Sequence, residues 1–159
     1  MQNEFNGVAF QLNGMAFAVD ALKVREIVGG ANWEPLSVEG EAEAFIQVRG
    51  KPARVLDLSA IFGFPPSVKG ELNCFITVHF LEGDRNRLAA IWVDKLLDLV
   101  KAPLAEVKAV PPGIGGIPGK FLLGFIEGEG EPIFLLDLGG VLREGFAGGR
   151  ERVLENKAS

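Results

Sequence analysis

The sequence is poor in the residues that build metal sites and covalent catalytic sites. It has one histidine, Cys74 as its single cysteine, and no tyrosine in 159 residues. A zinc site of the usual Cys/His type needs several such ligands, and one cysteine cannot form an internal disulfide. The sequence also lacks a Gly-x-Ser-x-Gly nucleophile elbow. These absences argue against an enzyme and against a bound metal or other cofactor, and the single cysteine suits a reducing compartment.

The chain also lacks an excess of basic residues, a long apolar run and an export signal. Its net charge is −5, whereas a nucleic-acid surface needs clustered lysine and arginine. No stretch approaches the roughly 18 uninterrupted apolar residues of a membrane-spanning helix. The first residues have neither the basic nor the apolar region of a signal peptide. We therefore expect a cytoplasmic protein that binds no nucleic acid and does not insert directly into the membrane.

The sequence does contain a repeated pattern, in which an apolar segment ends in an aspartate. Val19-Asp20 closes one apolar segment, and Val93-Asp94 closes a later one. Leu56-Asp57-Leu58 is repeated as Leu136-Asp137-Leu138, in the same order and at nearly the same interval. The repetition indicates one small β unit used twice. It also favours a structural role for the four aspartates, whose side chains can accept backbone N–H bonds in the turn after each strand.

Short apolar segments separated by turn residues predict an all-β chain. Asn13-Gly14 lies between alternating segments at 8–12 and 15–19 and is a strong hairpin signal. Further hairpins are expected from 44–50 with 52–58, from 72–81 with 88–93, and from 121–126 with 132–138. Residues 102–120 are rich in proline and glycine and predict an ordered crossing loop.

This spacing of short strands is typical of barrels or sandwiches, and the duplication favours two small barrels packed together. Each barrel alone would have a thin core, so we expect a shared apolar interface to stabilise both. The alternation places Val8, Phe10 and Leu12 on one face of their strand, and Met15, Phe17 and Val19 on one face of the next. Residues 1–142 are interpreted as one domain made of two such subdomains, and 143–159 as a charged, mobile tail.

Five ordered motifs resemble those of the CheW-type coupling proteins of bacterial chemotaxis. Phe17–Ile27 is similar to the family's apolar hairpin followed by Asp-x-Leu-x-Val-x-Glu-Ile. Residues 44–58 resemble its central Gly-Val-x-Asn-Leu-Arg-Gly signature and the following Val-x-Asp-Leu, with Ala44 and Gln47 in place of the usual glycine and asparagine. The matches at 91–94, 123–125 and 135–137 follow in the family's order, so the resemblance covers about residues 5–142.

The resemblance implies a single CheW-like domain of two intertwined five-stranded SH3-like barrels with short helical turns, whose halves exchange strands. It implies a non-catalytic adaptor of a two-component system, recruited to receptor arrays at the inner face of the membrane. Its partners would be the regulatory domain of a CheA-type histidine kinase and the cytoplasmic tip of methyl-accepting chemoreceptors. The alternatives are a CheW-like adaptor of another pathway, such as surface motility, and a small β-barrel that binds a ligand in its interior.

The surface that binds these partners is expected to include Val24, Glu26, Ile27, Gln47, Arg49 and Gly50. Strand alternation places Arg49 on one face with Phe45 and Gln47. There it either orders or contacts the receptor-facing surface, or it pairs with Glu26 or Glu43 and braces the barrel. Val24 either fills the core or lies exposed beside Glu26.

Three other residues carry expectations of their own. Cys74 is in phase with apolar neighbours and predicts a small core residue. His79 is expected on the other, partly exposed face of the same strand. Trp92 is out of phase with Ile91 and Val93, which suits a position between the barrels or at an exposed interface.

Overall fold

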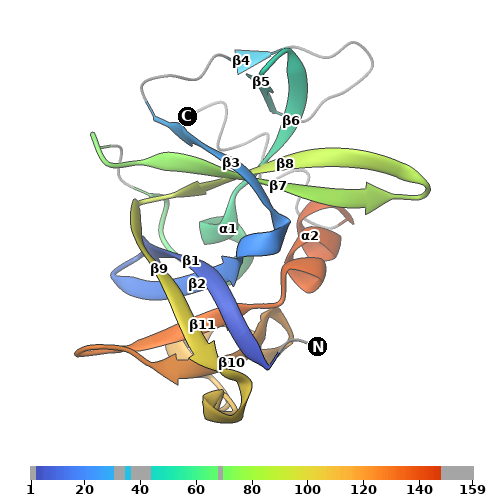
Figure 1. Ribbon diagram of the computed structural model, residues 1–159. Helices are drawn as coiled ribbons and strands as arrows, with labels where there is room; N and C mark the ends of the chain where they lie inside the picture. Colours follow the sequence, from blue (N-terminus) through green and yellow to red (C-terminus); the bar gives the residue numbers. More distant parts are fainter. Residues whose placement is uncertain (1–2, 31–34, 37–43, 68–69, 148–159) are drawn as a thin grey trace.

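The computed structural model describes residues 3–30, 35–36, 44–67 and 70–147, which are mostly β-strand (Figure 1). In chain order the elements are β1 (Glu4–Leu12), β2 (Met15–Asp20), the 3-10 helix η1 (Ala21–Lys23), β3 (Val24–Gly29), β4 (Pro35–Leu36), β5 (Phe45–Val48), β6 (Lys51–Leu56), α1 (Leu58–Phe62), β7 (Cys74–Glu82), β8 (Arg85–Val93), β9 (Lys95–Pro103), η2 (Leu104–Glu106), η3 (Ile114–Gly116), η4 (Gly119–Phe121), β10 (Leu122–Glu127), β11 (Pro132–Leu136) and α2 (Leu138–Ala147).

The strands form two sheets that exchange segments. The first has the order β10-β11-β2-β1-β9, and the second has the order β3-β7-β8-β6-β5 with the two-residue β4 at its edge. The early hairpin β1–β2 lies in the first sheet while β3–β6 lie in the second; the later hairpin β7–β8 lies in the second while β9–β11 return to the first. The predicted all-β fold of two intertwined five-stranded barrels is therefore confirmed. Each repeat of the sequence contributes a hairpin to one barrel and the remaining strands to the other.

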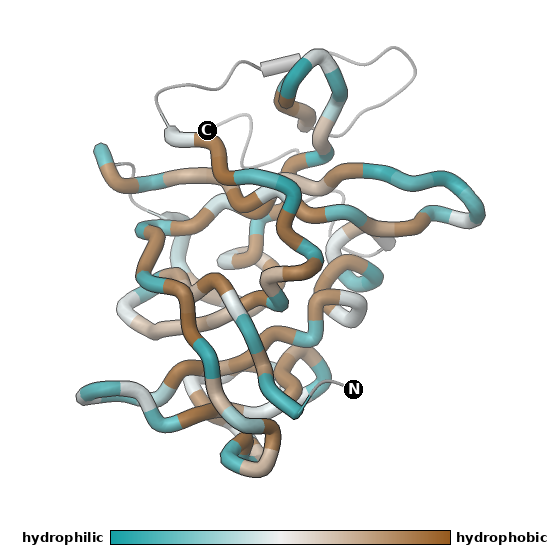
Figure 2. Tube along the Cα trace, viewed as in Figure 1, coloured by the Kyte–Doolittle hydropathy of each residue, from teal (hydrophilic) through white to brown (hydrophobic). Residues whose placement is uncertain are grey.

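Both faces of the central strands are buried, which divides the interior into three cores. The shared core is the largest and takes side chains from both sheets and both helices; its fully buried members include Phe10, Phe17, Ile76 and Ile91. The opposite faces of the same strands fill the first barrel around Ala18 and Leu135 and the second around Ile46, Phe75 and Ala90. Because side chains alternate along a strand, each central strand contributes to two of the three cores. Figure 2 shows hydrophobic residues along these strands and hydrophilic ones at the tips of the β7–β8 and β10–β11 hairpins.

Three of the four repeated aspartates cap the following turn as predicted. Asp20 accepts the N–H of Leu22, Asp57 that of Ala60, and Asp137 that of Gly140. Asp94 differs: its Oδ2 accepts the N–H of Asn13 at 2.9 Å, in the β1–β2 turn. The fourth aspartate therefore links the start of β9 to the first hairpin and does not cap a helical turn of its own.

Strand β9 was not predicted, because its leucines do not alternate with polar residues. It pairs with β1, and the register shifts between Val8 and Phe10. A β-bulge of this kind breaks the period-two pattern on which strand prediction depends. The expected crossing loop consequently begins only after Pro103, and it contains three short 3-10 helices.

Two further expectations are corrected by packing. Trp92 does not lie between the barrels: it is half-buried and packs against the core of the second barrel, with its ring centroid 4.6 Å from that of Phe75. Helix α2 continues to Ala147, past the boundary at which we expected the tail to begin. Gly145 is buried where a Cβ would collide with Leu56, and the Phe146 ring stacks 5.0 Å from that of Phe80. Residues 148–159 lie outside the described part of the chain.

Replacing Phe17 by alanine should destabilise both barrels at once. Phe17 is fully buried and its ring centroid lies 5.5 Å from Phe62, 5.8 Å from Phe10 and 6.0 Å from Phe134. We expect a loss of about 3–5 kcal/mol in the free energy of unfolding, measured by urea denaturation followed by circular dichroism. The exposed Leu123 offers a control, since Leu123→Ala should change stability by less than about 0.5 kcal/mol. Two separate transitions, only one of them shifted, would contradict the shared core.

Cys74 should be unreactive in the folded protein. Its thiol is buried in the shared core, as predicted, and desolvation raises its pKa above the ordinary value. Since the thiolate is the nucleophile, we expect a disulfide reagent at pH 8 to react with native protein at least about tenfold more slowly than with urea-unfolded protein. Equal rates would show that Cys74 is accessible.

Candidate partner-binding surface

Arg49 and Gly50 form the tight turn between β5 and β6, so Arg49 is not on the strand face with Gln47 as the alternation predicted. Their φ angles are 50° and 78°, close to the 53° and 76° of Asn13 and Gly14 in the β1–β2 turn. Two successive positive φ values are typical of a type I′ hairpin turn, for which Asn-Gly is the preferred sequence. A residue other than glycine, asparagine or aspartate is strained there by about 1–2 kcal/mol, because its Cβ approaches a backbone carbonyl. Turn chemistry alone therefore does not account for arginine at this position.

The guanidinium of Arg49 pairs with Glu26 of β3. Arg49 Nε donates to Glu26 Oε1 at 2.8 Å, and the two side chains are 76% and 25% exposed. Of the two pairings left open by the sequence, the one with Glu26 is present; Glu43 lies outside the described residues. An exposed pair of this kind stabilises a fold by at most about 1 kcal/mol. The rest of the guanidinium is accessible to a carboxylate of a partner.

The pair also closes the second barrel. Glu26 lies on β3 at one edge of the second sheet, whereas Arg49 follows β5 near the other edge. The contact therefore joins two edges that no backbone pairing within the described residues connects. The bracing role that we considered for Arg49 is thus compatible with its exposure.

Strand β3 separates the predicted residues into two groups. Val24 lies opposite Val78 and Ile27 opposite Ile76, on the face that contributes to the shared core. Glu26 lies opposite Thr77, on the face of the second barrel. Directly paired residues share a face of a sheet, so Val24 and Ile27 point toward the first barrel while Glu26 and Arg49 point away from it.

The apolar group is partly accessible. Val24 is half-buried against the shared core, on the face opposite to Glu26, and Ile27 is 39% exposed. Leu22, on η1 next to them, is exposed. Gln47 and Gly50 are also exposed, in β5 and in the turn that follows it, close to Arg49 in the sequence.

Two further exposed leucines, on β9, were missed from the sequence. Leu96 and Leu99 lie on the open edge of the first sheet, as Ile27 does on that of the second (Figure 1). The repeat carried a signal for one of them, because Leu96 follows Asp94 as Leu22 follows Asp20. We call Leu22, Val24, Ile27, Leu96 and Leu99 the apolar edge.

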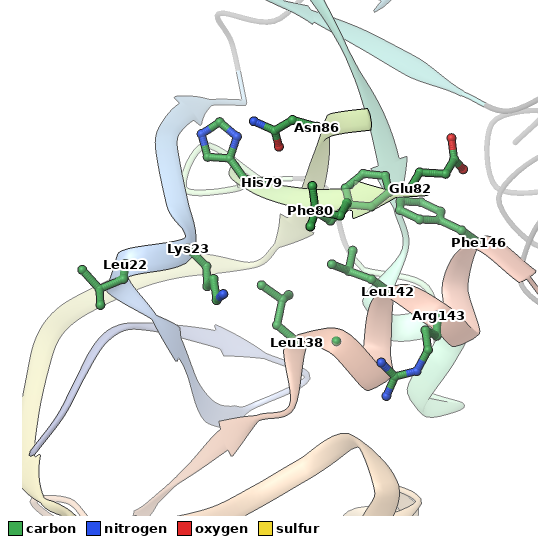
Figure 3. Close-up of a pocket in the computed structure, with 12 residues that line it drawn as sticks. Leu22, Lys23, His79, Phe80, Glu82, Asn86, Leu138, Leu142, Arg143 and Phe146 are labelled. Atoms are coloured by element: carbon green, nitrogen blue, oxygen red, sulfur yellow. The ribbon is translucent and has the colours of Figure 1, made fainter. Parts of the chain in front are cut away.

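A groove of about 830 Å³ lies between the β7–β8 hairpin, η1 and α2 (Figure 3). Its apolar side chains include Phe80, Leu138, Leu142 and Phe146, and Lys23, His79 and Arg143 are also among its lining residues. The guanidinium of Arg54 lies over the Phe146 ring, 4.2 Å from its centroid.

In the part of the chain that the structure describes, no cluster of three or more His, Cys, Asp or Glu could hold a metal ion. None of the described helices is long and apolar enough to cross a membrane.

Comparisons with known proteins agree with this geometry. A family model described as CheW-like domain matches residues 6–146. The crystal structure of the scaffolding protein TtCheW from Thermoanaerobacter tengcongensis superposes with a TM-score of 0.69 over 87% of each chain at 22% sequence identity, which shows the same fold of two SH3-like barrels. No curated protein matches the chain. Because the family model spans both barrels and most of α2, the chain belongs to the family of CheW-like domains.

Proposed function

We propose that this protein is a cytoplasmic chemotaxis scaffold that couples chemoreceptors to a CheA-type histidine kinase by binding both, without catalysis. The observation that carries the proposal is the family match over residues 6–146. The exposed Arg49–Glu26 pair and the apolar edge supply surfaces of the kind that such a role requires. Recruitment to receptor arrays would follow from receptor binding.

The two surfaces suit different kinds of contact. The apolar edge offers exposed leucine and isoleucine side chains on both sheets, which fit the apolar stripe of a helical receptor tip. Arg49 offers a guanidinium that is already oriented by Glu26 and can bind a carboxylate. A standard interface needs about 800 Å² per partner, so each partner would also cover neighbouring polar residues.

The alternatives differ in their support. An adaptor of another chemosensory pathway would use the same surfaces with a different receptor. A ligand inside a barrel has less support, because side chains such as Ala18 and Leu135 in the first barrel and Phe75 and Trp92 in the second fill those interiors. The groove beside α2 is open and lies outside both barrels.

The proposal is tested by calorimetric titration of the protein with the regulatory domain of each CheA-type kinase of its host. Saturable one-to-one binding would support the scaffold, and a receptor fragment would then be titrated into the complex. Absence of binding to every such kinase would overturn it.

Replacing Arg49 by asparagine should weaken partner binding at little cost to the fold. Asparagine suits the left-handed turn, as Asn13 does in the equivalent turn, so the free energy of unfolding should change by less than about 1 kcal/mol. Affinity for at least one partner should fall about tenfold or more, because a charge-assisted contact is lost. Arg49→His should behave in the same way.

The control for this variant is Arg85→Asn, which removes another exposed arginine beside a turn. It should leave both affinities unchanged. If Arg49→Asn also binds both partners like the wild type, Arg49 only braces the barrel.

Replacing Ile27 by aspartate should weaken receptor binding selectively. Ile27 is 39% exposed at the apolar edge, so a charge there is tolerated by the fold but opposes an apolar helix. We expect the dissociation constant for a receptor fragment to rise about tenfold or more, or about 1.4 kcal/mol. Leu123→Asp, at an exposed position on β10, should leave it unchanged, and equal effects of the two substitutions would argue against the apolar edge.

A further inference from the structure

The arrangement of β3 conflicts with regular strand geometry. Side chains three positions apart point to opposite faces of a strand, yet Val24 and Ile27 are both on the shared-core face. The reason is a register shift between Val24 and Glu26, which pair with the consecutive residues Val78 and Thr77. Arg25 is the extra residue of this β-bulge and is exposed. Without the bulge, one of the two apolar side chains would face away from the apolar edge.

One buried hydroxyl holds this bulge. Thr77 is 0% exposed on β7. Its Oγ1 accepts the backbone N–H of Glu26 at 3.0 Å and donates to the Glu26 carbonyl at 2.8 Å. Both backbone polar groups of Glu26 are therefore satisfied by a side chain. A bulge disrupts the local ladder of backbone bonds, and the hydroxyl replaces what is lost.

Packing gives no other reason for a threonine here. On the same face of β7, the neighbouring Phe75 is apolar and buried in the core of the second barrel, so an apolar side chain as small as valine would also suit this position. Thr77 is also the single threonine of the sequence, although threonine is generally favoured in strands. The hydroxyl is thus present where the bulge of β3 displaces the backbone of Glu26.

We propose that Thr77 is a positioning residue for partner binding, whose hydroxyl locks the Arg25 bulge and so sets the phase of β3. The lock places Val24 and Ile27 together on the apolar edge and directs Glu26 toward Arg49. Thr77 itself is buried and touches no partner. The part that concerns binding rests on the proposed scaffold function, whereas the lock is a property of the free protein.

The test uses Thr77→Val, which keeps the volume and removes the hydroxyl, with Thr77→Ser as the variant that restores it. The first readout is the hydrogen-exchange rate of the Glu26 amide in the full chain, measured by NMR without any partner. We expect exchange to accelerate about tenfold or more in Thr77→Val and to return toward the wild-type rate in Thr77→Ser. An unchanged Glu26 rate in Thr77→Val would overturn the proposal.

The second readout is affinity for a receptor fragment and for the kinase regulatory domain. Thr77→Val should lose about tenfold or more for at least one of them, and Thr77→Ser should regain most of it. Faster exchange with both affinities unchanged would overturn the positioning role and leave the scaffold function intact. If wild-type protein bound neither partner, the scaffold function would be wrong. The exchange rates would still show whether the Thr77 hydroxyl holds the bulge.

Ser59→Ala is the matched control. Ser59 is buried in α1 and its hydroxyl lies 3.2 Å from that of Ser67, so the substitution removes a buried hydroxyl away from β3. It should change neither the Glu26 exchange rate nor either affinity. Should Thr77→Val fail to fold, Thr77→Ala removes the same hydroxyl without adding bulk, and the same readouts apply.

Discussion

The shared core between the two barrels is the contact on which the rest of the molecule depends. Each barrel interior is small, and that of the first is built largely around alanine and a few branched residues. The shared core contains the cluster of phenylalanine rings around Phe17 and the packing of α1 and α2. Because β1, β2, β7 and β8 each present one face to it, the barrels cannot separate without exposing apolar surface from both sheets. Strand exchange adds a topological reason for the same cooperativity.

The two barrels close in different ways. In the first, Lys108 and Phe125 exchange backbone hydrogen bonds of 2.8 and 2.9 Å. In the second, the described closing contact is between side chains, Arg49 and Glu26. A backbone bridge carries no charge to the surface, whereas an exposed ion pair leaves a guanidinium available. The strained turn at Arg49 and the hydroxyl-held bulge before Glu26 are local departures from regular β geometry, and both converge on this pair.

A scaffold of this kind acts through fixed geometry. On β3, Val24 and Ile27 of the apolar edge lie on one face and Glu26, the partner of Arg49, lies on the other, so their relative orientation is set by the backbone of β3. The shared core anchors that strand through Val24, and Thr77 anchors it from the neighbouring strand. Two partners bound at these surfaces would be held in a defined register without any moving part or chemical step.

Local patterns in the sequence determined much of this structure. Asn13-Gly14 specified the first hairpin, the repeated aspartates specified turn caps at three of four positions, and the duplication indicated two packed barrels. The pairing of Arg49 with Glu26 was one of two that the sequence left open, the other being with Glu43.

The tertiary structure alone decided which face of its strand each side chain occupies, because this depends on strand register. Bulges in β1–β9 and β3–β7 shift the phase of side chains by one residue. For this reason the sequence pattern did not predict β9, and Val24 lies on the same face as Ile27 and opposite to Glu26. Contacts between residues that are distant in sequence also decided the positions of Trp92, which packs on Phe75, and of Gly145, which lies against Leu56. A one-residue shift in register moves every following side chain to the other face of the strand. The place where such a shift occurs is set by bonds to another strand, so it cannot be read from a short segment of the sequence.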